Sequence, residues 1–96
     1  MSEVSLSTKL RVADDVVFRS LDGEAVILSI ETGLFFGLTP VATRIWELVD
    51  GERALDQILA TLIAEYDAPA SDLERDLKEL ASQLVARRLA VPAVSP

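Results

Sequence analysis

The stretch Thr32-Gly33-Leu34-Phe35-Phe36-Gly37-Leu38-Thr39-Pro40 joins two parts of the chain whose apolar residues repeat with different periods. On its N-terminal side, residues 16–38 alternate at period two, which is typical of β-strands. From Pro40 onward, apolar residues recur every three to four positions, as on one face of a helix. This order predicts an α+β domain in which a three-stranded antiparallel sheet is followed by three helices, a winged-helix-like arrangement with the sheet placed first.

Two turn signals divide the first part into three short strands. Asp22-Gly23 is typical of a two-residue hairpin turn, and Thr32-Gly33 marks a second turn with its glycine at positive φ. Between the turns, period two places Val26, Leu28 and Ile30 on one face and the intervening residues on the other. Three such strands form a meander, which is marginal by itself and must pack on other elements.

Start and stop signals divide the second part into three helices. Thr39-Pro40 is an N-cap followed by a first-turn proline, and Gly51 ends that helix. A second helix is expected over about residues 54–66. The pattern Ser71-x-x-Glu74 predicts a capping box that opens the third helix.

The two ends of the chain show no clear period. We expect residues 1–15 to be a flexible N-terminal segment, residues 16–91 to form the domain, and residues 92–96 to be a flexible tail. The N-terminus lacks a basic region followed by an apolar run, and the longest apolar run, residues 25–28, is far too short to cross a membrane. These features predict a cytoplasmic protein with no membrane partner.

The composition argues against several classes of function. The 96 residues are the size of one domain and include no cysteine and no histidine, so the commonest catalytic bases, thiol nucleophiles and metal ligands are missing. Sixteen acidic residues against nine basic ones give a formal charge of −7, which disfavours binding to a phosphate backbone. We therefore predict a protein that is not an enzyme and has no metal site and no cofactor.

The charged residues of the third predicted helix have an ordinary explanation. Glu74 lies four residues before Lys78, a favourable pair on a solvated face. Residues 72–88 carry four acids and four bases, whereas a helix that reads DNA needs several phosphate contacts. Arg87 and Arg88 fall in the predicted last turn, where cations complement the helix dipole. No nucleic-acid partner is expected.

The third predicted strand, Leu34-Phe35-Phe36-Gly37-Leu38, is uncharged and holds two of the three phenylalanines. Leu34, Phe36 and Leu38 could be core residues, with Phe35 half-covered by the helices. Alternatively, as an edge strand, it could accept an extended peptide through its unpaired N–H and C=O groups. Gly37 suggests a bulge or a place where another backbone comes close. The residues leave these alternatives open.

The order of these features resembles the PqqD family over residues 16–91. The resemblance is carried by apolar spacing, by an aspartate-glycine pair after the first helix and by a tyrosine that ends the second. The residues concerned are Gly23, Val26-Ile27-Leu28, Thr32 to Pro40, Ile45 to Gly51, Ile58-Leu59, Leu62 and Tyr66. Members act in pyrroloquinoline quinone biosynthesis and in related modified-peptide pathways, including lasso-peptide clusters. The aromatic third strand and Ile45-Trp46 look closer to the lasso-type relatives.

The resemblance implies a peptide-recognition element that binds the leader of a ribosomally synthesised precursor peptide. It would present the leader to a modifying enzyme, which is a radical SAM enzyme, a protease or a cyclase. The leader would dock as an added strand on the third strand, against the third helix. The residues implied on this chain are Leu34, Phe35, Phe36, Gly37, Leu38, Leu73, Asp76, Leu77 and Leu80.

Two other functions compete with leader binding. One is a winged-helix DNA-binding regulator, which the helix order allows and the charge disfavours. The other is a dimerisation domain that uses the same edge strand, and a weak homodimer is compatible with either peptide binding or a structural role.

Overall fold

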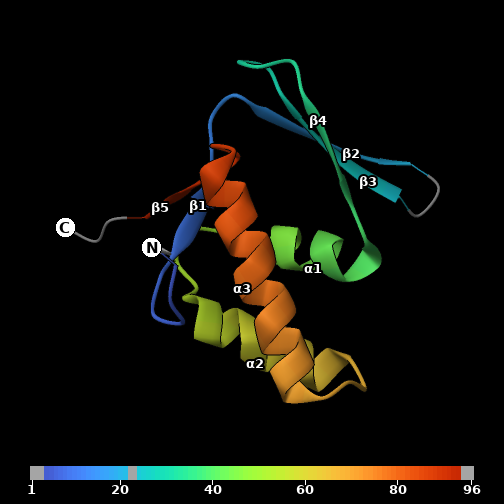
Figure 1. Ribbon diagram of the computed structural model, residues 1–96, viewed down its shortest axis with the longest axis vertical. Coiled ribbons are helices and arrows are strands. Elements are labelled where there is room, and N and C mark those ends of the chain that lie inside the picture. The colour runs from blue at the N-terminus through green and yellow to red at the C-terminus, as the bar shows by residue number, and fades with distance from the viewer. Residues whose placement is uncertain (1–3, 22–23, 94–96) are drawn as a thin grey trace.

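The computed structural model of the chain describes residues 4–21 and 24–93. Figure 1 shows the order of its elements: β1 (Leu10–Val12), β2 (Val16–Leu21), β3 (Glu24–Ser29), β4 (Phe35–Leu38), α1 (Pro40–Leu48), α2 (Leu55–Glu65), α3 (Ala70–Ala86) and β5 (Ala90–Pro92). The predicted α+β class, with a three-stranded antiparallel sheet followed by three helices, is confirmed. The structure adds a two-stranded sheet of β1 and β5 that the sequence pattern did not predict.

β3 is the central strand of the three-stranded sheet, with β2 and β4 antiparallel on its two sides. Its register places Ile27 opposite Phe36. Gly33, in the turn before β4, has the predicted positive φ, 74°. The other predicted turn, Asp22-Gly23, lies outside the described residues.

Gly37 occupies a regular position of β4, opposite Val26, so the prediction of a bulge is wrong. A Cβ atom built on Gly37 would meet nothing within 4 Å, so no described backbone comes close to this position either. Its φ is not in the left-handed region. Neither backbone conformation nor packing within the described chain therefore requires glycine here.

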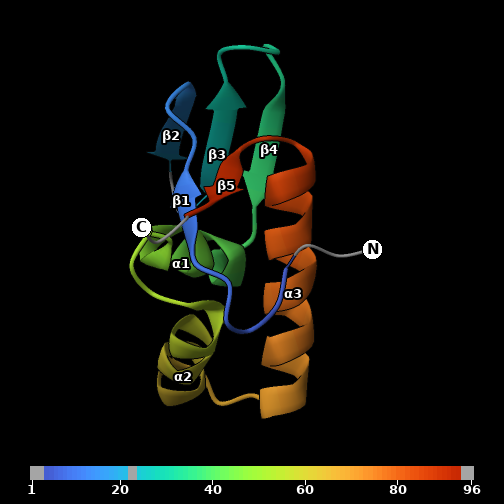
Figure 2. The ribbon, with the colours of Figure 1, turned by 90° about the vertical axis from the view of Figure 1, so that its left-hand side faces the viewer.

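The two faces of β3 have the different surroundings that period two predicts. Ala25 and Ile27 are 2% and 0% exposed and belong to the core that the sheet shares with the helices. Val26 and Leu28 are half-buried and Ile30 is 64% exposed, all on the outer face. Figures 1 and 2 show the sheet at one end of the molecule, next to α1, with α3 running alongside β4. The sheet thus packs on the helices with one face.

One of the predicted helix caps is present and another is wrong. Thr39 caps α1, because its Oγ1 accepts the Ala42 N–H at 3.1 Å. The capping box predicted at Ser71 does not form, because α3 already begins at Ala70 and Ser71 lies inside it. Pro69 takes the N-cap position, and its carbonyl oxygen accepts the first N–H groups of the helix. No side-chain hydrogen bond therefore caps the N-terminus of α3.

Segments near both ends of the described chain are tied into the fold: β1 lies within residues 1–15, which the sequence predicts to be flexible, and β5 extends to Pro92. β1 and β5 pair antiparallel, with Leu10 opposite Pro92. Leu10 is 1% exposed and Ala90 is not exposed at all. These residues lie in short segments without a local period, so only their tertiary contacts distinguish them from loops.

The prediction that Gly51 ends the first helix is wrong, because α1 ends at Leu48 with Val49 as its C-cap. Asp50 and Gly51 instead form the tight link between α1 and α2. The Asp50 carboxylate accepts the N–H groups of Arg53 and Glu52, each at 2.9 Å, and these bonds hold the pKa of the carboxyl below its ordinary value. Gly51 has φ 81°, and its N–H donates to the Leu10 carbonyl oxygen at 2.7 Å. Asp50 therefore orders the link between the helices, and Gly51 joins this link to β1.

Replacing Gly51 with alanine should lower the free energy of unfolding by about 1–2 kcal/mol, because an L side chain disfavours the left-handed region. Urea unfolding followed by circular dichroism measures this. Gly37→Ala is the matched control, since its φ is ordinary and its Cβ would meet open space. If both variants unfolded at the same urea concentration, the strain assigned to Gly51 would be absent.

Leu10→Ala should cost about 2–5 kcal/mol of stability, because it leaves a cavity where the side chain was fully buried. Leu34→Ala removes the same atoms from a side chain that is 66% exposed and should change stability by less than about 0.5 kcal/mol. The two unfolding midpoints are compared under identical conditions. An equal, small effect of both substitutions would show that β1 does not belong to the folded core.

Candidate functional site

β4 leaves one edge of the three-stranded sheet without a partner strand among residues 4–21 and 24–93. The Ser29 N–H donates to the Leu34 carbonyl oxygen at 3.1 Å, so the main-chain groups of Leu34 point toward β3 and away from the open edge. Because bonding direction alternates along an antiparallel strand, Phe36 and Leu38 also bond inward to β3. The N–H and C=O groups of Phe35 and Gly37 therefore point to the open edge.

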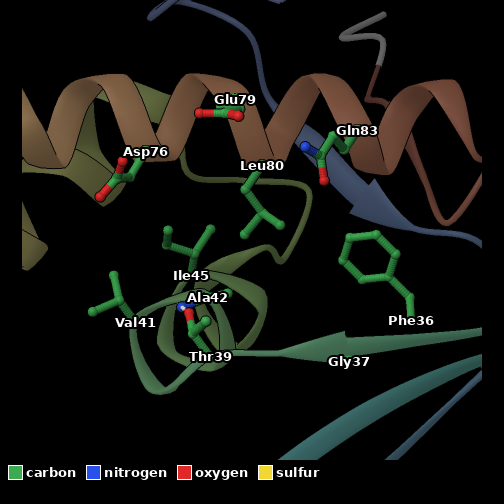
Figure 3. A pocket seen from close by; sticks show the side chains of 10 residues that line it. All are labelled: Phe36, Gly37, Thr39, Val41, Ala42, Ile45, Asp76, Glu79, Leu80 and Gln83. Atoms are coloured by element: carbon green, nitrogen blue, oxygen red, sulfur yellow. Dashed lines mark hydrogen bonds between the residues drawn. The ribbon is translucent and has the colours of Figure 1, made fainter.

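A cleft of about 370 Å³ lies between β4, α1 and α3, beside this edge. Figure 3 shows its lining side chains, which come from all three elements. They are Phe36, Gly37, Thr39, Val41, Ala42, Ile45, Asp76, Glu79, Leu80 and Gln83. The floor is apolar, and the polar groups come mainly from α3.

Helical spacing explains why four residues of α3 reach the cleft together. Asp76, Glu79, Leu80 and Gln83 stand at positions i, i+3, i+4 and i+7, which share one face of a helix. In Figure 3, Asp76, Leu80 and Gln83 point from α3 toward α1 and β4. α3 therefore forms the wall opposite the open strand.

Phe36 lies at the end of this cleft opposite to Asp76 (Figure 3). It is half-buried, and the guanidinium carbon of Arg87 lies 5.1 Å from the centre of its ring, within cation–π range. A second hollow, of about 520 Å³, shares Phe36 and continues past Leu34 to Arg87 and Arg88. The cleft and the second hollow together therefore extend along β4, between this strand and the C-terminal half of α3.

The sequence predicts Arg87 and Arg88 in the last turn of α3. This prediction is wrong, because the helix ends at Ala86 and both arginines follow it. Arg87 is the C-cap residue, and Arg88 has φ 59°. The end of the helix turns the chain toward β5, and this brings Arg87 over the ring of Phe36. Arg87 therefore lines the second hollow and contacts Phe36, rather than only complementing the helix dipole.

An ion pair between helices orients α1, which supplies one wall of the cleft. Nε and Nη2 of Arg44 donate to the two carboxylate oxygens of Glu65 on α2, at 2.8 and 2.7 Å. The hydrogen bond to Arg44 lowers the pKa of the Glu65 carboxyl. Two-point contact of this kind restricts rotation of α1 against α2.

The residues implied for peptide binding fall into three groups. Phe36, Gly37, Asp76 and Leu80 come together at the cleft. Leu34 and Phe35 are 66% and 74% exposed and line the second hollow, so the reading in which the first residue of the strand is core is wrong. The remaining three lie in the core, with exposures of 7% or less, and line neither hollow: Leu38, Leu73 and Leu77.

Several residues that line the cleft were not predicted from the sequence. Glu79 and Gln83 could have been found by extending the helical spacing from Asp76 and Leu80. The α1 residues, among them Ile45, carried only a general apolar stripe. Their place beside β4 depends on the angle between the strand and the helix, which the sequence does not state.

The outer face of the sheet carries a third, more open hollow of about 610 Å³. Its lining is apolar apart from Arg19 and includes outward residues of all three strands, such as Val17, Leu28 and Phe35. Successive residues of β4 therefore serve different surfaces, because Phe36 faces the cleft and Phe35 faces outward.

Within residues 4–21 and 24–93, no three or more carboxylates, histidines or cysteines gather in a metal-binding arrangement. No helix in the described part of the chain has the length and apolar character needed to cross a membrane.

Comparison with solved structures finds the same fold in proteins bound to peptides. The chain is similar to TbiB1 in complex with the TbiA(beta) leader peptide, at 34% identity and a TM-score of 0.74, over 83% of this chain and 93% of that one. It also superposes on lasso peptide synthetase B1 complexed with the leader peptide, with a TM-score of 0.77 over 88% and 99% of the two chains. The identity to that synthetase, 23%, supports the fold only.

Comparison of sequences points the same way. The PqqA binding protein of Rhizobium meliloti (strain 1021) is 31% identical over 88 residues, which are 92% of this chain and 84% of that protein. The PqqA binding protein of Xanthomonas oryzae pv. oryzae (strain PXO99A) is 42% identical over 52 residues, 54% of this chain and 56% of its own. The family model described as coenzyme PQQ synthesis protein D (PqqD) matches residues 24–90. The chain therefore belongs to the PqqD family.

Proposed function

We propose that this chain is a non-catalytic module that binds the leader of a ribosomally synthesised precursor peptide and presents it to a modifying enzyme. The observation that carries the proposal is the open edge of β4, which faces a cleft walled by α3. Membership of a family whose relatives are named for PqqA binding, and likeness to a leader-peptide complex, support the same function.

Binding would proceed by strand addition to β4. The N–H and C=O groups of Phe35 and Gly37 offer up to four hydrogen bonds to an extended peptide. Successive side chains of the added strand would point alternately into the cleft and toward the outer face of the sheet. Leu80 and Ile45 would contact the apolar side chains that enter the cleft.

Simple energetics require both backbone and side-chain contacts. Ordering a disordered leader costs about 2–5 kcal/mol, while micromolar affinity needs a net binding free energy of about −8 kcal/mol. Four main-chain bonds contribute at most about 6 kcal/mol net of water. Apolar leader side chains in the cleft must therefore supply the remainder.

The proposed pathway and enzyme partner rest on membership of the family and not on the geometry of the cleft. The partner would be a radical SAM enzyme, a protease or a cyclase acting on the held precursor, in the cytoplasm where ribosomal peptides are made. The likeness to TbiB1 bound to the TbiA(beta) leader peptide and the likeness to the PqqA binding protein of Rhizobium meliloti (strain 1021) support two candidate ligands, a leader of the TbiA(beta) kind and PqqA. Comparing the affinities for the TbiA(beta) leader peptide and for PqqA would distinguish the two.

Phe35→Pro should weaken leader binding about tenfold or more, because proline removes one edge N–H and places its ring where the added strand would lie. The fold should tolerate proline at the first residue of an edge strand. Phe35→Ala is the matched control, which removes the side chain and keeps the N–H. Fluorescence anisotropy with labelled TbiA(beta) leader, PqqA and the precursor encoded beside the gene provides the dissociation constants.

Two outcomes would contradict peptide binding at this edge. If none of the three peptides bound the parent protein, the proposed function would be wrong. If the proline and alanine variants bound equally well while remaining folded by circular dichroism, the peptide would not use β4. A DNA-binding regulator would instead bind duplex DNA with an affinity that collapses between 50 and 500 mM salt, about as a power of the salt concentration.

We also propose that any self-association uses the same open edge, because an unpaired apolar strand pairs readily with a second copy. Saturating leader peptide should then convert dimers into one-to-one complexes, which sedimentation equilibrium detects as a fall in average mass per protein chain. A dimer whose amount did not change with added leader would place its interface elsewhere.

A further inference from the structure

The space that β4 and α3 share has opposite charges at its two ends. Asp76 and Glu79 line the end next to α1, and Arg87 lies at the end next to Phe36. No cation is paired with the Glu79 carboxylate within residues 4–21 and 24–93, and Asp76 has only the exposed Arg75, at 3.7 Å. These charges remain available to a ligand in the cleft.

The distance between the two ends corresponds to a short piece of extended peptide. From the midpoint of Asp76 and Glu79 to Arg87 is about 14 Å along α3, at 1.5 Å per residue. An extended strand rises about 3.3 Å per residue, so about four residues cover this distance. An even spacing keeps both side chains of the peptide on the same face, toward α3.

The direction of the chain decides the order of the two charges. β4 and α3 run in opposite directions past the cleft, as Figure 3 shows, with Phe36 and Gln83 at one end and Thr39 and Asp76 at the other. All described strands of this sheet pair antiparallel, and a strand added in the same way would run parallel to α3. Its N-terminal part would then face Asp76.

We infer that the cleft and the adjoining second hollow together select peptides with a lysine or arginine facing Asp76 and Glu79, followed about four residues later by an aspartate or glutamate facing Arg87. This inference rests on the peptide binding proposed above and adds its electrostatic specificity. Partly exposed charge pairs contribute little affinity each, so they act mainly by excluding peptides with the reverse charges. Apolar side chains between them occupy the cleft floor.

The test uses a displayed library of random 14-residue peptides selected on the parent protein at 50 mM salt. The selected pool should be enriched in a basic residue four positions before an acidic one. Reversing both charges in a selected peptide should weaken binding about threefold to tenfold, and this difference should shrink at 500 mM salt.

Charge-reversed proteins identify the residues responsible. Selection on the Asp76→Lys/Glu79→Lys variant should replace the leading basic residue with an acidic one, and Arg87→Glu should invert the preference at the second position only. Asp72→Lys/Glu74→Lys is the matched control, since it makes the same charge change on α3 outside the cleft lining. Its pool should keep the parental pattern.

The outcomes separate this inference from the proposed function. If no library peptide bound the parent, peptide binding itself would fail and the inference with it. If peptides bound and lost affinity in the Phe35→Pro variant, yet the pool showed no charge pattern, the charge specificity would be wrong and peptide binding would stand. A pattern in the reverse order, or one that the control pair altered as much as the cleft pair, would also overturn it.

Discussion

The burial of every second residue of β3 is the constraint on which the rest of the structure depends. Ile27 is completely buried at the centre of the sheet, and Ala25 is nearly so. Because the side-chain period of a strand is two, this burial excludes a register shift of one residue in either neighbouring pair. The register then decides that Phe36 faces α3, that Phe35 faces outward, and which main-chain groups of β4 remain unpaired.

A domain of this size has a small hydrophobic core, and segments near both ends of the described chain contribute to it. Leu10 enters the core from β1, and the Gly51 N–H holds the same residue through its carbonyl oxygen. β5 covers the other side of β1 directly after α3. The pairing of both ends leaves β4 as an edge of the main sheet that the described chain itself does not cover.

The proposed function depends on the shape of a strand edge and needs no catalytic residues. Binding of an added peptide strand requires an open strand edge, a second element that faces this edge across a cleft, and a few side chains that discriminate between peptides. β4, α3 and the cleft between them meet these requirements with ordinary apolar and charged residues.

The sequence by itself determined the class and order of the elements and drew attention to the third strand, because period, turn residues and caps are local properties. It also determined that Gly33 lies in a turn before the third strand, since its place follows from turn chemistry. Only the tertiary structure decided that Leu10 is core while Leu34 is exposed, because neighbours distant in sequence bury one leucine and not the other. The same holds for Leu77, which its helix turns into the core, and for Arg87, which meets Phe36 only after the helix has ended.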